Sequence, residues 1–131
     1  MVNFNKTFTH DLQFGELSEK KVAEILQSDK IEVKTERDIW ASTGNIAIEY
    51  ECNGKPSGLT TTQATFWIHV FYNQGTFCGF EAFEVASLKK VINKMIKDEV
   101  AIKKSGGDNN KSKLILVPIS RLFEYFAKVI G

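Results

Sequence analysis

Acidic residues and one lysine alternate along two short segments of the chain, "IEVK" and "IEYE". Side chains two residues apart on a β-strand point to the same face of the sheet. On strands, Glu32 and Lys34 therefore share a face, and so do Glu49 and Glu51. If the two strands are neighbours, their carboxylates meet on one surface, where they repel each other unless protons or a cation neutralise them.

Such a cluster suits a hard divalent cation. Mg²⁺ and Mn²⁺ prefer oxygen ligands, keep part of their water shell and are bound by only a few carboxylates. The bound ion can orient a phosphodiester and promote ionisation of an attacking water, while a neighbouring lysine stabilises the charge that develops on the phosphate. The alternative interpretation is a solvated sheet face, because the same alternation occurs in any half-exposed strand.

Hydrophobic periodicity predicts the elements that position these residues. A helix is expected over residues 16–27, with Val22, Ile25 and Leu26 forming a buried stripe. The strands expected around the cluster are residues 30–36, 45–52 and 65–72. The last of these, "TFWIHVFY", is almost entirely β-branched and aromatic, so we expect a central strand buried on both faces.

In the second half of the chain, hydrophobic periodicity predicts further helices and strands. They are a strand or two in residues 75–85, a helix over 87–98, a strand over 113–119 and a final helix over 121–130. The stripes expected to be buried are Leu88, Val91, Ile92, Met95 and Ile96 in the first helix, and Leu122, Phe126, Val129 and Ile130 in the second. Residues 103–113, "KKSGGDNNKSK", are rich in Gly, Asn and Ser and predict a mobile loop.

The order of these elements predicts an α/β or α+β fold, with a mixed central sheet flanked by helices. A length of 131 residues fits a single domain over residues 1–131. Hydrophobic residues make up 43% of the chain and charged residues 25%, which is typical of a globular protein. The formal net charge of +1 gives no global attraction for nucleic acid, so such binding must depend on local patches.

The cysteines and the hydropathy argue against a disulfide-rich protein, a cysteine-based metal site and a membrane protein. Cys52 and Cys78 are too few for a disulfide framework and lack the spacing of a metal site. No apolar run approaches the roughly 18 residues of a membrane span, and no signal-peptide pattern opens the chain. We therefore expect no membrane association and a cytoplasmic location, in the host cell if the protein is encoded by a phage.

The segment "IEVKTERDIWASTGNIAIEYECNGKPSGLTTTQATFWIHV" resembles the core of phage-type nucleases of the PD-(D/E)XK superfamily. In that group, a Glu-Val-Lys strand is followed by a strand of the form Thr-Gly-Asn-hydrophobic-x-hydrophobic-Glu and then by a Gly-Lys-Pro-Ser-Gly turn. The similarity covers residues 14–72. It implies a restriction-endonuclease-like fold and hydrolysis of DNA phosphodiesters with Mg²⁺ or Mn²⁺, by an endonuclease, an exonuclease or a junction resolvase.

The resemblance implies roles for particular residues. Glu32 and Lys34 match the acid and the lysine of the signature, with Glu32 as a metal ligand and Lys34 assisting hydrolysis. Many members have a further glutamate on the first helix, and resolvase-like members place it shortly after a glycine. Glu16 and Glu19 are the candidates here, and Glu19 is preferred because it lies one helical turn before Val22.

The chain departs from the signature at the aspartate, which is expected well upstream of the Glu-x-Lys strand. Either Asp29 takes that role from a compressed hairpin, or Glu49 replaces it from the following strand. The remaining possibility is a degenerate site that only binds. Gln63, in "QATFW", resembles the glutamine of a Gln-x-x-x-Tyr element that assists some exonuclease members.

Contacts with DNA are expected from cationic, hydroxyl and aromatic side chains near the cluster. They are Arg37, Trp40, Lys55, Ser57 and Thr61. Small nucleases of this kind often gain reach on duplex DNA by forming homodimers, but the sequence leaves the oligomeric state open. Two other functions stay open: a catalytically inactive domain of the same fold that binds nucleic acid or protein, and a structural adaptor whose polar sheet face is only solvated.

Overall fold

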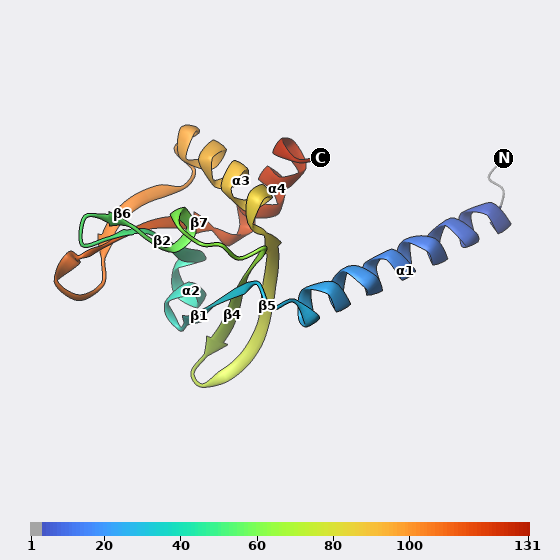
Figure 1. Cartoon of the computed structure of the whole chain (residues 1–131), viewed down its shortest axis with the longest axis horizontal. Coiled ribbons are helices and arrows are strands. Elements are labelled where there is room, and N and C mark those ends of the chain that lie inside the picture. The colour runs from blue at the N-terminus through green and yellow to red at the C-terminus, as the bar shows by residue number, and fades with distance from the viewer. Residues whose placement is uncertain (1–3) are drawn as a thin grey trace.

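Two β-sheets and four α-helices form the computed structural model, which describes residues 4–131 (Figure 1). The α-helices are α1 (Phe4–Gln27), α2 (Ile39–Thr43), α3 (Val85–Lys97) and α4 (Ile119–Val129). The strands are β1 (Ile31–Arg37), β2 (Asn45–Cys52), β3 (Lys55–Pro56), β4 (Phe66–Asn73), β5 (Thr76–Glu84), β6 (Ile102–Gly106) and β7 (Ser112–Pro118). Two short 3₁₀ helices, η1 (Gly58–Thr60) and η2 (Asp108–Asn110), lie in the connections. The expected mixture of helices and strands is confirmed.

The strands divide into two sheets instead of the one mixed sheet that was expected. The first has the order β1-β4-β5, with β1 parallel to β4 and β5 antiparallel to it. The second has the order β3-β2-β7-β6 and is antiparallel throughout. The helix α2 connects the first sheet to the second. Gly44 follows the last residue of α2 and has a left-handed φ of 73°. This turn separates β1 from β2, so the two acidic strands are not neighbours.

The core lies where both sheets meet α3 and α4. Trp67 of the first sheet, Ile46 and Ile48 of the second, and Leu88 and Leu122 of the two helices are fully buried there. The expected stripe of α3 is confirmed, because its members Leu88, Val91, Ile92 and Met95 are all buried and Ile96 packs partly against them. β4 is a central strand, and Phe66 to His69 are buried on both of its faces, as expected.

Residues 103–113 form a hairpin, so the expected mobile loop is wrong. β6 pairs antiparallel with β7, with Lys103 opposite Ile115 and Lys104 opposite Leu114. Lysine side chains on an edge strand are compatible with pairing and discourage further strand association. The Gly and Asn residues that suggested a loop make the turn, since Gly107, Asn109 and Asn110 have positive φ angles. At the C-terminus, Ile130 was expected to be buried in the final helix but is 44% exposed.

The first helix is longer than expected and its apolar stripe is not buried. α1 begins at Phe4 and projects away from both sheets (Figure 1). Val22 is 53% exposed and Leu26 is 64% exposed, and only Ile25 of the expected stripe is half-buried. Periodicity correctly indicated an amphipathic helix, but it does not determine what that helix packs against. Among the helices of residues 4–131, none is long and apolar enough to cross a membrane.

Candidate functional site

The charged face of β1 points toward the core side of its sheet. Along this strand Ile31 and Val33 are exposed, whereas Glu32 and Lys34 are half-buried. In the register with β4, the neighbours of Glu32 and Lys34 on that face are Trp67 and His69, both 0% exposed. The alternation is therefore the reverse of a strand that buries its apolar residues and exposes its charged residues.

Glu32 and Lys34 form an ion pair at the edge of this inner face. Lys34 Nζ lies 3.2 Å from Glu32 Oε1, and the two side chains are 42% and 38% exposed. The ammonium also lies 5.6 Å from the centre of the Trp67 ring, which gives it a favourable cation–π neighbour. The pair is thus positioned by the core on one side and open to a ligand on the other.

A polar hollow of about 440 Å³ lies beside Glu32. Its lining includes Asp29, Glu32, Gly58, Thr61 and Gln63, which come from the start of β1 and the turn before it, from η1, and from the segment between η1 and β4. The carbonyl of Lys30 accepts hydrogen bonds from the backbone amides of Thr65 and Phe66 at 2.7 and 3.2 Å, so the two sides are fixed together. The hollow brings together four residues that the sequence suggested: Asp29, Glu32, Thr61 and Gln63.

Glu49 lies behind the wall of the hollow instead of facing it. Glu49 Oε2 accepts a hydrogen bond from Ser57 Oγ at 3.0 Å, and Oε1 accepts one from Ser112 Oγ at 2.8 Å. Gly58, which lines the hollow, packs so closely on Glu49 that a Cβ there would lie 2.1 Å from the Glu49 carbonyl oxygen. Oε2 of Glu49 therefore fixes the turn that shapes the hollow, and Oε1 ties Glu49 to the start of β7.

The strand β2 reaches this turn through an irregularity. The pairing of β2 with β7 shifts register between Glu49 and Glu51. The carbonyl of the intervening Tyr50 accepts hydrogen bonds from the Ser57 amide at 3.1 Å and from Thr60 Oγ at 2.8 Å. Glu51 is paired with Lys113 at 3.0 Å, on the second sheet. The expected pairing of the two acidic strands in one sheet is wrong, whereas a meeting of Glu32, Lys34 and Glu49 around a cation stays a prediction.

A buried network next to Lys34 was missed by sequence reasoning. Glu36 Oε1 accepts a hydrogen bond from the Ala47 amide at 3.0 Å and lies 3.1 Å from His69 Nδ1. Trp67 Nε1 donates to His69 Nε2 at 2.7 Å, which leaves the histidine proton on Nδ1, where it is donated to Glu36. Because Ala47 belongs to β2, this network joins the two sheets. Glu36 continues the alternation of Glu32 and Lys34, and that signal could have indicated it.

Glu81 is the second residue that was missed on this face. It lies opposite His69 in the pairing of β4 with β5. Its Oε2 atom is buried without a hydrogen-bond partner, and burial raises the pKa of the Glu81 carboxyl. Its position two residues before the buried Phe83 was the available sequence signal. No set of three His, Cys, Asp or Glu side chains within residues 4–131 has the arrangement of a preformed metal site.

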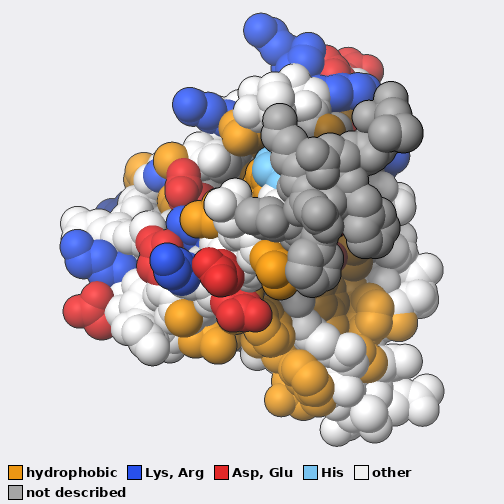
Figure 2. Space-filling model, turned by 90° about the vertical axis from the view of Figure 1, so that its right-hand side faces the viewer, with side chains coloured by type: hydrophobic (Ala, Val, Ile, Leu, Met, Phe, Trp, Pro, Cys, Tyr) orange, Lys and Arg blue, Asp and Glu red, His pale blue; other side chains and the backbone are white. Residues whose placement is uncertain are grey.

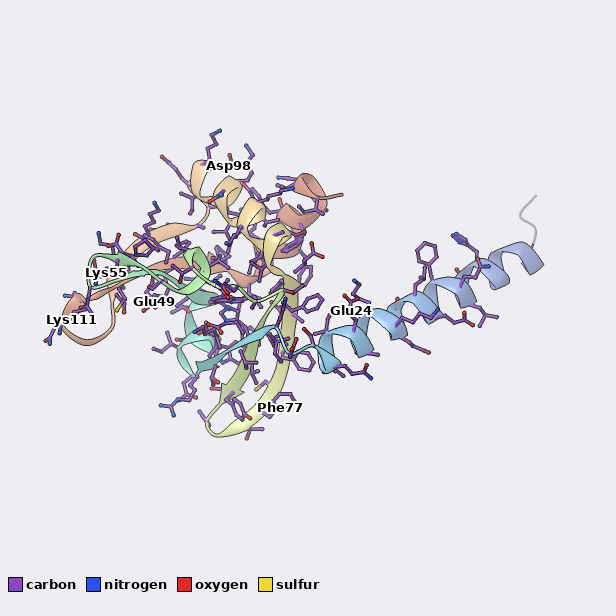
Figure 3. The ribbon with its side chains drawn as sticks, in the orientation of Figure 1. Glu24, Glu49, Lys55, Phe77, Asp98 and Lys111 are labelled. Carbon is purple, nitrogen blue, oxygen red and sulfur yellow. The ribbon has the colours of Figure 1, made fainter. Side chains whose placement is uncertain are left out.

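Several other expected site residues lie away from the hollow. Glu16 and Glu19 border a shallow groove on α1 itself, together with Asp11, Leu12 and Gly15. Figure 3 shows that α1, on which Glu24 is labelled, leads away from the part of the molecule that contains Glu49. The structure therefore does not bring the α1 glutamates to Glu32.

The expected DNA contacts are also dispersed. Arg37 lies at the far end of β1, beside Asp38 and Tyr72. Lys55 is exposed on the edge strand β3, at the end of the second sheet (Figure 3). Trp40 is half-buried: its Nε1 donates to the Tyr72 carbonyl at 2.8 Å and its ring packs edge-on against Phe71. A role for these residues in binding DNA stays a prediction.

Comparison of the chain with protein-family models, with curated proteins and with solved structures returned no match.

Proposed function

We propose that this protein is a divalent-metal-dependent nuclease that hydrolyses DNA phosphodiester bonds. The observation that carries the proposal is the position of Glu32 and Lys34 on the core-side face of β1, beside a polar hollow. Partial burial removes water from charged groups, which is costly unless the charges are paired or used. A solvated sheet face, as a structural adaptor would have, does not account for this placement.

The donor set of the hollow fits Mg²⁺ or Mn²⁺. Asp29 and Glu32 supply carboxylates, Gln63 an amide oxygen, and Thr61 and Thr62 hydroxyls, so oxygen ligands predominate. Asp29 is a better replacement for the missing aspartate of the signature than Glu49, whose two oxygens accept hydrogen bonds from Ser57 and Ser112. The ion, when bound, supplies Lewis-acid activation of the phosphate and of a water molecule.

The residues of the chain have separate tasks in this proposal. Glu32 and Asp29, which both line the hollow, would hold the cation. Lys34 places its ammonium next to Glu32, where it stabilises negative charge that develops on the phosphate. The Glu36–His69–Trp67 network holds the inner face of β1 against β4 and so fixes the direction of the Lys34 side chain.

The second candidate is an inactive domain of the same fold that binds nucleic acid. The position of Glu16 and Glu19 on the projecting α1 favours it, because the glutamate that the signature expects from the first helix is then missing from the site. Such a domain would bind phosphates through lysines and backbone amides but would not cleave DNA.

The deciding experiment is cleavage of supercoiled, linear, single-stranded and branched DNA in the presence of Mg²⁺, Mn²⁺ or EDTA. We expect metal-dependent cleavage that is lost in Glu32→Gln. Glu51→Gln is the matched control, since Glu51 also forms an ion pair with a lysine but lies on the second sheet. Absence of cleavage on every DNA, with no effect of metal on the melting temperature, would contradict the nuclease and support the binding domain.

A further inference from the structure

The helix α1 carries a broad apolar stripe, whose side chains extend over a little more than half of its circumference at 3.6 residues per turn, and no described part of the chain covers it. Leu12, Phe14, Leu17, Val22 and Leu26 are all between 53% and 64% exposed. In proteins, most of the stability of a helix comes from packing of its apolar face and not from helix propensity. The stripe therefore needs a partner surface, and that surface has to be apolar.

A second apolar surface lies on the outer face of the three-stranded sheet. Ile31 and Val33 of β1 and Phe80 of β5 point to this face, opposite to Glu32 and Lys34, and are 36%, 50% and 51% exposed. Tyr72 and Phe77 pair with each other and continue the surface toward the β4–β5 turn. Phe66 and Ile68 form its buried centre and are not part of the core between the sheets.

The two surfaces lie on the same side of the molecule. Figure 2 looks at the side from which α1 projects and shows hydrophobic side chains gathered on the lower part of this face. In Figure 1 the helix leaves the first sheet beside β5 without crossing the sheet. The outer face and the stripe of α1 thus complement each other in character, but within the described chain α1 does not pack extensively against any strand of the sheet.

The short connection between α1 and β1 favours contact between two chains. Residues 28–30 are held by hydrogen bonds from the Ser28 amide to the Ile25 carbonyl and from the Lys30 amide to Ser28 Oγ, at 3.3 and 3.1 Å. The Lys30 carbonyl accepts hydrogen bonds from the backbone amides of Thr65 and Phe66. For α1 to reach its own sheet, the chain would have to reverse within these residues and break the bonds at Ser28 and Lys30. Short connections of this kind favour exchange of an element between copies.

We infer that the protein forms a symmetric dimer in which α1 of each copy packs on the outer face of the sheet of the other copy. The ten side chains of the stripe and the outer face, each about half exposed, present roughly 800 Å² of apolar surface per copy. That amount matches the roughly 800 Å² that each partner buries in a stable complex. Two-fold symmetry uses both surfaces of both copies and leaves none open.

The test is the oligomeric state of the full chain, measured by analytical ultracentrifugation across micromolar concentrations. We expect a dimer, and we expect Leu17→Glu on α1 and Phe80→Glu on the outer face each to weaken it by at least about 100-fold, because each places a charge in an apolar contact. Glu24→Gln, which alters an exposed side chain of α1, is the control and should leave the dimer unchanged. Circular dichroism verifies that each variant is folded, and Val33→Lys replaces Phe80→Glu if that variant does not fold.

Three outcomes would overturn the inference. The first is a monomer at all concentrations, in which α1 is free or packed on its own sheet. The second is a dimer that Leu17→Glu dissociates but neither outer-face variant affects, because the helices would then pair with each other. The third is a dimer that none of these variants affects. Cross-linking between isotopically light and heavy copies separates contacts between chains from contacts within one chain.

Discussion

Lys34 is the residue of β1 to which the proposed function assigns a direct role in cleavage. We expect Lys34→Ala to lower the single-turnover cleavage rate at least about 100-fold, since the ammonium stabilises charge in the transition state. The free energy of unfolding should change by less than about 1 kcal/mol, because the ion pair with Glu32 is substantially exposed. Rates and urea unfolding of the same samples measure both effects.

The control for this variant is Lys113→Ala, which removes a lysine that forms a similar ion pair with Glu51. It should leave the rate unchanged. Lys34→Arg keeps the charge but presents it in a planar fork, so we expect a rate between those of the original protein and Lys34→Ala. Undiminished cleavage by Lys34→Ala would place the chemistry elsewhere in the chain.

Glu81 should lower the stability of the fold at neutral pH. Burial raises the pKa of its carboxyl above that of the unfolded chain, so the folded state keeps the proton to a higher pH than the unfolded state does. The contribution of Glu81 to the free energy of unfolding therefore falls as pH rises from the unfolded pKa through the folded pKa. We expect Glu81→Gln to raise the melting temperature at pH 7 and to leave it nearly unchanged near pH 4.

The melting temperatures of the two proteins across pH 4–8 test this directly. Asp98 and Glu124 have pKa values lowered mainly by hydrogen bonds from Lys94 and from Arg121, so their stabilisation is present above the unfolded pKa and is lost as pH falls through the folded pKa. These contributions are the same in both proteins and cancel in the difference. A difference that does not depend on pH would show that the Glu81 carboxyl has the same pKa in the folded and in the unfolded chain, and so that its burial does not shift its titration.

The turn around η1 is the element that fixes the hollow beside Glu32. Gly58 has φ 54° and no space for a Cβ next to the Glu49 carbonyl, whereas Gly54 has φ 78° and open space. Alanine at Gly54 should cost about 1 kcal/mol from the left-handed backbone alone. We expect Gly58→Ala to cost about 2–4 kcal/mol, because Glu49 and Ser57 must also move.

The pair of variants separates steric contact from backbone strain. Chemical denaturation gives the two stabilities, and cleavage assays at a temperature where both proteins are folded give the effect on the site. Gly58→Ala should lower cleavage and Gly54→Ala should not. Equal stability losses would mean that the close approach of Gly58 to Glu49 does not hold this turn.

The elements show what local sequence determines and what it does not. The strand β2 has the expected bounds, and α3 buries the expected stripe, because alternation and helical periodicity are local properties. The pairing of β1 depends on β4, which is distant in sequence, and no local pattern specifies it. The inference that β1 and β2 are neighbours in one sheet failed for this reason.

The site was predictable to a similar degree. Glu32 and Lys34 could be identified from their spacing, and the hollow also contains Asp29 and Gln63. The alternation could have indicated that Glu36 shares the face of Glu32 and Lys34, but its contact with His69 could not be identified, because no local pattern shows which side chain of another strand it meets. Likewise, helical periodicity marks the apolar face of α1 but says nothing about the chain that covers it.

At the scale of the whole molecule, charge is balanced but its distribution is not uniform. With a formal net charge of +1, any attraction for DNA must come from local groups of lysines. One such group lies at the end of the second sheet, where Lys55 and Lys111 are close together (Figure 3). The Asn53 amide donates to the Lys111 carbonyl at 2.9 Å and holds the two turns that carry these lysines side by side.

If this end of the sheet holds the DNA that Glu32 and Lys34 cleave, a double charge reversal should weaken binding without changing the chemistry. We expect Lys55→Glu with Lys111→Glu to lower affinity at least about 10-fold and to reduce the slope of log affinity against log salt by about 2, one phosphate contact for each lysine. The rate at saturating DNA should stay the same. The control is Lys90→Glu with Lys97→Glu, which changes the net charge by the same amount at two lysines of α3. It shows whether affinity depends on where the lysines lie or only on the total charge of the protein. Equal losses in both double variants would show that DNA responds only to the overall charge of the protein and not to a surface at this end of the sheet.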